Sequence, residues 1–150
     1  MNALFENAVD SIDFGLRLYL HGEFATAQKH ALLAVFHGVE LLLKSRLYEE
    51  HPLLIYRNPE GKISDDATTV GLSETLARFR NCGIRISDND VSALEDLRVR
   101  RNRIAHHRYV KNERDYYVLG KSLGFVYRFL EEHLDTALED HLEEDLFEKA

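Results

Sequence analysis

Apolar residues recur at helical spacing along most of the chain. Over residues 3–20 they stand three or four positions apart, which is the period of an amphipathic helix: Phe5, Val9, Ile12, Leu16 and Tyr19. Residues 23–50 are apolar on nearly every side between Ala31 and Leu43, and such a pattern predicts a central helix that is buried all round.

Three more helical patterns follow in the second half. Residues 72–81 predict a short helix, residues 88–108 a longer one, and the capping run 112–115 opens a last helix whose apolar positions continue to Leu134. No stretch shows the sustained alternation of a strand. The sequence therefore predicts an all-α fold, an antiparallel bundle of four or five helices.

The longest connection, residues 51–69, lies between the second and third predicted helices. It contains both prolines, Pro52 and Pro59, and a polar run that ends at Lys62, a composition typical of a loop. Loops this long inside a small domain are usually functional or disordered. We expect this loop to be mobile.

Length and composition limit the class of protein. At 150 residues the chain is long enough for one domain with its own core. It lacks both an apolar run of membrane-spanning length and the basic, then apolar, start of a signal peptide. Its single cysteine, Cys82, has no partner for a disulfide within the chain. These features predict a cytoplasmic protein that does not cross a membrane.

The negative charge of the chain is concentrated at its C-terminus. The net charge is −7, and residues 131–150 hold nine acids and one base, so residues 1–130 carry +1. A near-neutral body with one arginine-dense stretch is compatible with a local RNA contact, though not with coating nucleic acid. Residues 136–150 predict either a helix extension that packs on a partner or a solvated acidic tail, and we favour the extension.

The arginine-dense stretch lies in the fourth predicted helix. Projected at about 100° per residue, Leu94, Leu97, Ile104 and Ala105 form one apolar stripe, and Arg101 falls inside it. A guanidinium cannot lose its charge, so at a buried position it needs a carboxylate or an anion. Either a neighbouring helix supplies that carboxylate, or Arg101 holds a phosphate.

A second face of this helix carries Asn102 and His106, which lie side by side because they are four residues apart. Arg100, Arg103 and His107 point more nearly away from the apolar stripe. An imidazole can accept and donate protons near neutral pH. Arg, Asn and His together could therefore bind a phosphodiester and move a proton during its cleavage.

Polar residues interrupt the buried helix at 23–50 along one line: His30, His37, Glu40 and Lys44. Glu40 and Lys44 could form a surface ion pair. Alternatively, Glu40 could orient Arg101 or His106 across a helix contact. Two histidines seven residues apart do not make a metal site, and we predict none.

Residues 101–106 resemble the Arg-(four to six residues)-His motif of HEPN domains, in which a polar residue typically follows the arginine; here it is Asn102. Residues 37–44 also resemble the second helix of HEPN families, and the resemblance covers roughly residues 1–135. It implies a HEPN-type bundle with a long loop between the second and third helices. It also implies a metal-independent endoribonuclease, of the toxin or defence type, that uses no cofactor.

HEPN ribonucleases place this motif at a homodimer interface, which would solve a geometric difficulty. Arg101 and His106 are five residues apart, about 140° around a helix, so one copy does not bring them together. Two copies facing each other across a two-fold axis would. The resemblance implies His106 as general base or acid, Arg101 as the group that stabilises the phosphorane, and Asn102 as its positioning partner.

The expected reaction is attack of a ribose 2′-hydroxyl on the adjacent phosphodiester of RNA, which needs no metal because the nucleophile is already next to its target. Neighbouring cationic side chains would bind the RNA backbone: Arg98, Arg103, His107 and Arg108. Glu40, Lys44 and Tyr109 would support this site.

The register of the motif is ambiguous, because Arg101 with His107 also fits the allowed gap. In one HEPN subfamily a tyrosine two residues after the histidine is modified by a partner nucleotidyltransferase, which acts as the antitoxin. Tyr109 stands at that place only if His107 is the motif histidine; otherwise it is a core aromatic residue. We favour His106, since it shares a face with Asn102.

Two other functions stay open. The chain could be a non-catalytic HEPN-like module that binds RNA, a nucleotide or a partner protein, since such folds can lose activity and keep their scaffold. It could also be an antitoxin or assembly protein whose acidic C-terminus binds a basic partner.

Overall fold

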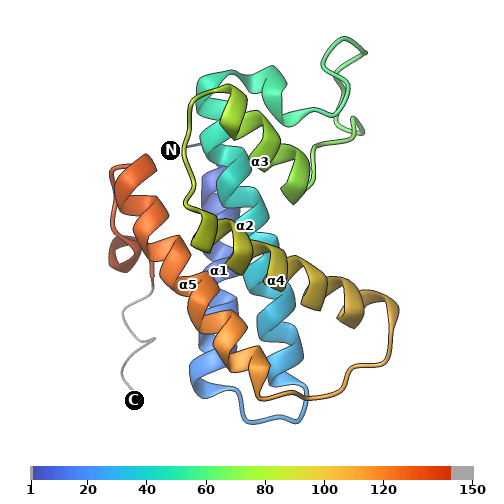
Figure 1. Ribbon diagram of the computed structural model, residues 1–150, viewed down its shortest axis with the longest axis vertical. Helices are drawn as coiled ribbons and strands as arrows, with labels where there is room; N and C mark the ends of the chain where they lie inside the picture. Colours follow the sequence, from blue (N-terminus) through green and yellow to red (C-terminus); the bar gives the residue numbers. More distant parts are fainter. Residues whose placement is uncertain (1, 143–150) are drawn as a thin grey trace.

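The computed structural model describes residues 2–142, and helices are the only regular elements within that range. Five α-helices are described there, and Figure 1 shows them gathered into a bundle. They are α1 (Ala3–His21), α2 (Ala27–Glu50), α3 (Leu72–Asn81), α4 (Asp88–His106) and α5 (Arg114–His133), with two 3₁₀ turns, η1 (Pro52–Ile55) and η2 (Leu138–His141). An isolated bridge joins Tyr56 and Thr69. The predicted all-α bundle is confirmed.

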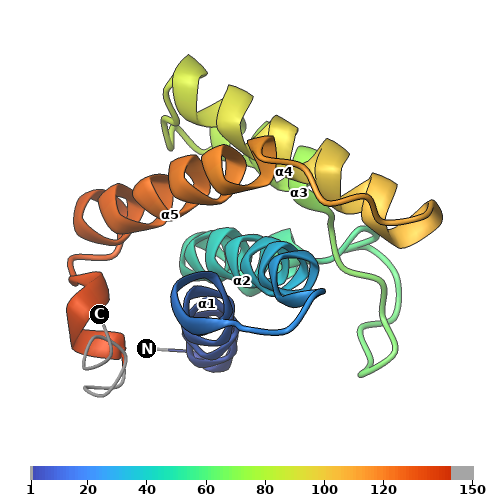
Figure 2. The same ribbon diagram turned by 90° about the horizontal axis from the view of Figure 1, so that it is seen from below.

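α2 is the centre of the bundle. Figure 2 shows it between α1 on one side and the layer of α4 and α5 on the other, and it contacts α1, α3, α4 and α5. Its buried positions extend nearly all round the helix, as the sequence predicts, and seven of its aliphatic side chains have no exposed surface: Ala31, Leu32, Val35, Val39, Leu42, Leu43 and Leu47. Each buried Leu or Val contributes about 1.5–3 kcal/mol to folding.

α1 and α2 approach closely where each helix carries a glycine. A Cβ on Gly38 of α2 would lie 2.5 Å from Cγ1 of Ile12 and 3.0 Å from the carbonyl oxygen of Ala8. A Cβ on Gly15 of α1 would lie 2.7 Å from Cγ2 of Val35. The two glycines therefore permit a backbone separation that any larger residue would prevent.

α4 begins after a capping serine, Ser87, and is fixed to α5 near that end. The Ser87 hydroxyl accepts a hydrogen bond from the backbone N–H of Asp90 at 3.2 Å, which satisfies one of the unpaired donors of a helix N-terminus. The Asp90 carboxylate also accepts a hydrogen bond from Arg128 of α5 at 2.5 Å. The start of α4 is thus positioned both by its own cap and by a neighbouring helix.

The α2–α3 connection, residues 51–71, is held at both ends. The backbone N–H of Val70 donates to the carbonyl oxygen of Ile55 at 2.9 Å, and that of Arg57 donates to Thr68 at 2.9 Å. Ile55 and Val70 are buried. We expect the whole loop to be mobile from its sequence, but both of its ends are anchored. The expectation is therefore restricted to the exposed middle, residues 57–66.

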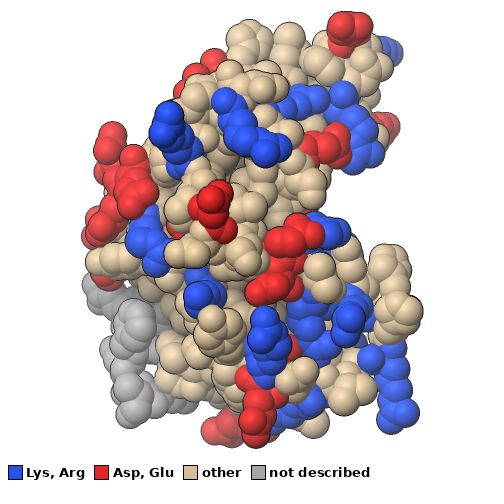
Figure 3. All heavy atoms as spheres, viewed as in Figure 1, with Lys and Arg blue, Asp and Glu red and all other residues tan. Residues whose placement is uncertain are grey.

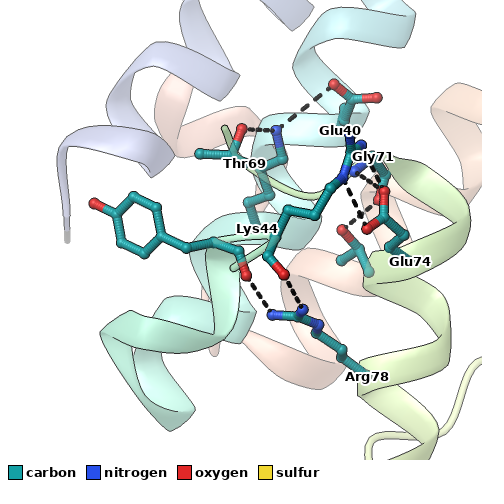
Figure 4. Close-up of polar contacts among 9 residues, drawn as sticks. Glu40, Lys44, Thr69, Gly71, Glu74 and Arg78 are labelled. Carbon is teal, nitrogen blue, oxygen red and sulfur yellow. Dashed lines mark hydrogen bonds and ion pairs between the residues drawn. The ribbon is translucent and has the colours of Figure 1, made fainter. Parts of the chain in front are cut away.

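Arginine side chains complete this anchoring. Nη1 of Arg78, on α3, donates to the carbonyl oxygens of Leu54 and Tyr56 at 2.5 and 2.8 Å. Arg57 pairs with Glu74, with 2.7 Å between Nη2 and Oε1. Figure 4 shows Glu74 and Arg78 of α3 beside this connection. The pKa of the Glu74 carboxyl lies below its ordinary value, chiefly because Arg57 donates a hydrogen bond to it.

The C-terminal segment corrects one prediction. α5 ends at His133, and Asp135 adopts a left-handed backbone with φ of 52°, so the chain turns back instead of extending the helix. Leu138 of η2 is buried, and the His141 ring lies 4.9 Å from the Phe5 ring of α1. The helix extension favoured for residues 136–150 is therefore wrong up to residue 142, and the remainder of that segment lies outside the described residues.

Candidate functional site

α4, which carries the motif, packs on α2 and α5 with only part of its length. Leu94, Leu97 and Ile104 are buried, as predicted. Ala105 is exposed, contrary to the prediction, because the last turn of α4 projects beyond the bundle (Figure 1). The helix also ends at His106, two residues before the predicted end. The motif therefore lies on a protruding helix end that solvent reaches from several sides.

Arg101 is half-buried against α2. Its guanidinium carbon lies 5.2 Å from the centroid of the Phe36 ring, a side chain of α2 with 6% of its surface exposed. Nη1 of Arg101 donates to the side-chain oxygen of Asn102 at 3.1 Å. No carboxylate among residues 2–142 pairs with this guanidinium. The aromatic ring holds the cation in place without neutralising it.

Asn102 and His106 lie on the solvent side of α4. His106 is exposed and Asn102 is half-exposed. Val99, on the same side, is 42% exposed. No hydrogen bond joins Arg101 to His106 within the described part of the chain, which agrees with their separation of about 140° around the helix. One subunit therefore presents the arginine and the histidine on different sides of one helix.

The arginine that does have an internal carboxylate is Arg100, which the sequence projection places away from the core. Its Nε and Nη2 donate to the two carboxylate oxygens of Asp115 at 2.6 and 3.0 Å. Asp115 lies in the first turn of α5, and its side chain is 1% exposed. The prediction for Arg100 is wrong because α4 has a second buried face, toward α5, as well as the one toward α2.

This ion pair also organises the α4–α5 turn, residues 107–113. Nη2 of Arg100 donates to the carbonyl oxygen of Val110 at 2.7 Å, and the Tyr109 hydroxyl donates to Asp115 at 3.4 Å. The hydrogen bond to Asp115 raises the pKa of Arg100. Burial, and then the negative charge of Asp115, raises the pKa of Tyr109. Tyr109 is thus a half-buried structural residue whose hydroxyl is engaged within the protein.

An open pocket beside the α4–α5 turn collects cationic side chains: Arg103, His107, Arg108 and Lys111. None of the three permanently charged members has a carboxylate partner among the described residues. Figure 3 shows Lys and Arg side chains gathered where α4 ends and α5 begins. Lys111 was not predicted, although it directly follows the arginine-dense stretch.

The residues predicted to bind RNA therefore do not form one group. Arg103, His107 and Arg108 share the pocket. Arg98 does not line it and instead pairs with Glu95 on the outer face of α4. None of the predicted catalytic residues, Arg101, Asn102 and His106, lines this pocket. They lie on other sides of the same end of α4.

Glu40 and Lys44 lie elsewhere. Nζ of Lys44 is 3.7 Å from Oε1 of Glu40 and 3.0 Å from the hydroxyl oxygen of Thr69. Figure 4 shows the three side chains beside the α2–α3 connection. Among the described residues no hydrogen bond or ion pair joins Glu40 to Arg101 or His106, and the carboxylate of Glu40 pairs with Lys44 instead. This contact with Lys44 is the ion pair that the sequence analysis gives as its first interpretation of these two residues.

The described residues, 2–142, contain neither a candidate metal site nor a candidate membrane span. No three His, Cys, Asp or Glu side chains come together there in a way that could hold a metal ion. None of the described helices offers the length and apolar run that crossing a bilayer requires.

Comparisons of the chain with family models, with curated proteins and with solved structures find no match. The resemblance to HEPN domains therefore rests on the residues of the motif and of α2 alone.

Proposed function

We propose that the protein is a HEPN-type, metal-independent endoribonuclease that acts as a homodimer. The observation that carries this proposal is the Arg101 guanidinium, half-buried on Phe36 and without a carboxylate partner in the described residues. A cation held in that way keeps its donors available for an anion. Asn102 is hydrogen-bonded to this guanidinium, and the exposed His106 lies on another side of the same last turns of α4. Groups for phosphate binding and for proton transfer are therefore both present at this helix end, although one subunit does not bring them together.

The proposed chemistry is an internal transfer of the phosphodiester. His106 takes the proton of the ribose 2′-hydroxyl, whose oxygen then attacks phosphorus. Arg101 stabilises the negative charge that grows on the non-bridging oxygens, and Asn102 orients the guanidinium. The bond from phosphorus to the 5′-oxygen breaks, and that oxygen leaves with a proton from a second imidazole or water. The products are a 2′,3′-cyclic phosphate and a 5′-hydroxyl.

A homodimer would supply what one subunit lacks. The outer face of α4 exposes Val91 and Val99, at 37% and 42%, beside Asn102 and His106. Apolar residues on the solvent side of a helix favour contact with another surface. If two α4 helices meet through this face about a two-fold axis, both copies of the motif border one cleft.

The test is cleavage of single-stranded RNA by the purified protein. His106→Ala and Arg101→Ala are each expected to lower kcat roughly 100- to 10,000-fold. His107→Ala is the matched control, since it should mainly raise KM by weakening the basic pocket. If His106→Ala cleaves as fast as the unmodified protein, the assignment is wrong.

The oligomeric state supplies an independent measurement. Val99→Glu would put two carboxylates into the proposed interface, so it should convert a dimer to a monomer in sedimentation equilibrium and abolish cleavage. A protein that is monomeric while still cleaving RNA contradicts the dimer proposal.

The second candidate is a non-catalytic module that binds RNA or a nucleotide. It is favoured by the pocket of unpaired cations, because Arg103, Arg108 and Lys111 can bind phosphates whether or not a reaction follows. Expression in growing cells distinguishes the two functions: the ribonuclease should slow growth and its His106→Ala form should not, whereas a binding module would leave growth unchanged in both forms.

A further inference from the structure

The basic pocket is one end of a longer groove. Three more open pockets adjoin it along the seam between α4 and α5, and each shares lining residues with the next. Counted from the basic pocket, the first and second pockets share Arg100 and Arg103. The second and third share Asp96 and Arg114, and the third and fourth share Lys121. We call this continuous depression the α4–α5 groove.

The lining of the α4–α5 groove carries excess positive charge. Seven arginine or lysine side chains and four carboxylates line it. Three of the carboxylates are already paired with arginines of the groove: Asp90 with Arg128, Asp96 with Arg114 and Asp115 with Arg100. Four cations have no carboxylate partner in the described residues: Arg103, Arg108, Lys111 and Lys121. A polyanion would gain these four contacts without having to break an existing ion pair.

An aromatic ring lies where the last two pockets of the groove, those farthest from the basic pocket, meet. Tyr117 of α5 is 54% exposed and lines two of the adjoining pockets. The guanidinium carbon of Arg114 is 5.7 Å from the ring centroid, and Nζ of Lys121 is 5.2 Å from it. A cation therefore stands on either side of this exposed ring along the helix, and the ring offers a face on which a planar group could stack.

We propose that the α4–α5 groove binds single-stranded RNA, with a base stacked on Tyr117 and the flanking phosphates on the cations. Positive charge interleaved with an exposed aromatic ring is how proteins hold single strands without reading their sequence. A duplex would not serve, because its bases are stacked on one another and cannot reach the ring. This inference rests on the proposed function for its purpose, since the groove would guide the strand toward the motif end of α4.

The experiment measures RNA binding separately from cleavage. The His106→Ala protein is titrated against a fluorescent single-stranded oligoribonucleotide, and binding is followed by anisotropy. Adding Tyr117→Ala is expected to weaken binding roughly 5- to 100-fold, whereas Tyr117→Phe should preserve it. Tyr127→Ala is the matched control, because Tyr127 is also on α5 and 41% exposed but does not line the groove.

An abasic strand of the same length identifies the contact. The abasic strand has the phosphates but lacks the bases. The Tyr117→Ala and parent proteins should therefore bind it with equal affinity. Lys121→Ala should weaken binding of both strands and lower the slope of log affinity against log salt by about 0.7.

Each outcome decides one proposal. Equal binding by the Tyr117→Ala and parent proteins, or tighter binding of duplex RNA or poly-glutamate than of the single strand, overturns the groove. Tyr117-dependent binding without any cleavage by the unmodified protein keeps the groove and removes the ribonuclease. Cleavage with no change in kcat/KM on replacing Tyr117 keeps the ribonuclease and removes the groove.

Discussion

The molecule has two regions rich in arginine, and they use the residue in opposite ways. At the α2–α3 connection, Arg78 donates to two backbone carbonyl oxygens and Arg57 pairs with Glu74. At the α4–α5 turn, Arg103 and Arg108 line an open pocket and have no carboxylate partner among the described residues. The first region uses its guanidinium groups to fix a loop, and the second leaves them available to solvent.

The number of arginines in a segment therefore does not by itself identify a binding site. What matters is whether their donors are already satisfied by the protein. Even beside the α4–α5 turn, Arg100 belongs with the structural arginines, since Asp115 and a carbonyl oxygen accept hydrogen bonds from it.

The largest effect on stability is expected at Asp115. Asp115→Ala removes the buried partner of Arg100 and should lower the free energy of unfolding by about 3 kcal/mol. Asp96→Ala is the control, because its ion pair with Arg114 joins two half-exposed side chains and is worth about 0–1 kcal/mol. Urea denaturation of both variants measures the difference. Equal losses would mean that the Arg100 pair is no more structural than a surface contact.

Replacing one arginine from each region tests the comparison directly. Arg78→Ala leaves two carbonyl oxygens without a charged donor and should cost about 1.5–3 kcal/mol of unfolding free energy. Arg103→Ala, at the pocket, should change stability by less than about 0.5 kcal/mol. A loss on replacing Arg103 that matches the loss for Arg78 would show that the pocket arginines are structural too.

RNA affinity should respond in the reverse order. The double variant Arg103→Ala and Arg108→Ala removes two phosphate contacts, so the slope of log affinity against log salt should fall by about 1.4 for a single strand. Arg80→Ala, an exposed arginine on α3, should leave that slope unchanged. Anisotropy titrations at several salt concentrations, in the His106→Ala background, provide the measurement.

The smallest effect is expected on the stability of the fold at acid pH, through the ion pair between Glu74 and Arg57. The folded-state pKa of Glu74 is lowered by Arg57, so its stabilising contribution is complete above pH about 4.3, the ordinary glutamate value, and is lost as the pH falls through the lower folded-state pKa. Both side chains are well exposed, so the contribution is small. Glu74→Gln should make the acid limb of the stability profile slightly shallower. If the acid limb of the Glu74→Gln variant were steeper than that of the parent protein, the ion pair with Arg57 would not be stabilising.

Much of the fold follows from helical periodicity. The predicted helix at 72–81 coincides with α3, and the one at 3–20 differs from α1 by a single residue at its end. Strong apolar periods and clear caps fix such helices locally. The C-terminal turn at Asp135 does not follow, because the leucines beyond it keep a helical spacing while the chain folds back onto α1.

The site was harder to predict, for a physical reason. A projection of α4 alone identifies one apolar stripe, whereas the helix is buried toward both α2 and α5. Arg100 and Arg101 are neighbours in the sequence and face different helices, so only tertiary packing decides that Asp115 pairs with one and Phe36 covers the other. From the sequence, Asp115 is predicted to be part of the capping run at the start of the last helix. No residue near it in the sequence indicates that its side chain is buried.

The close approach of α1 and α2 bears on when the chain could become active during its own synthesis. Both helices end by residue 50, so the pair can assemble on the ribosome while α4 is still being made. Protease treatment of ribosome-bound chains truncated after residue 95 should find residues 3–50 already protected. Since the proposed reaction needs the motif from two finished polypeptides, a translating message would not be exposed to cleavage by the very chain that it encodes.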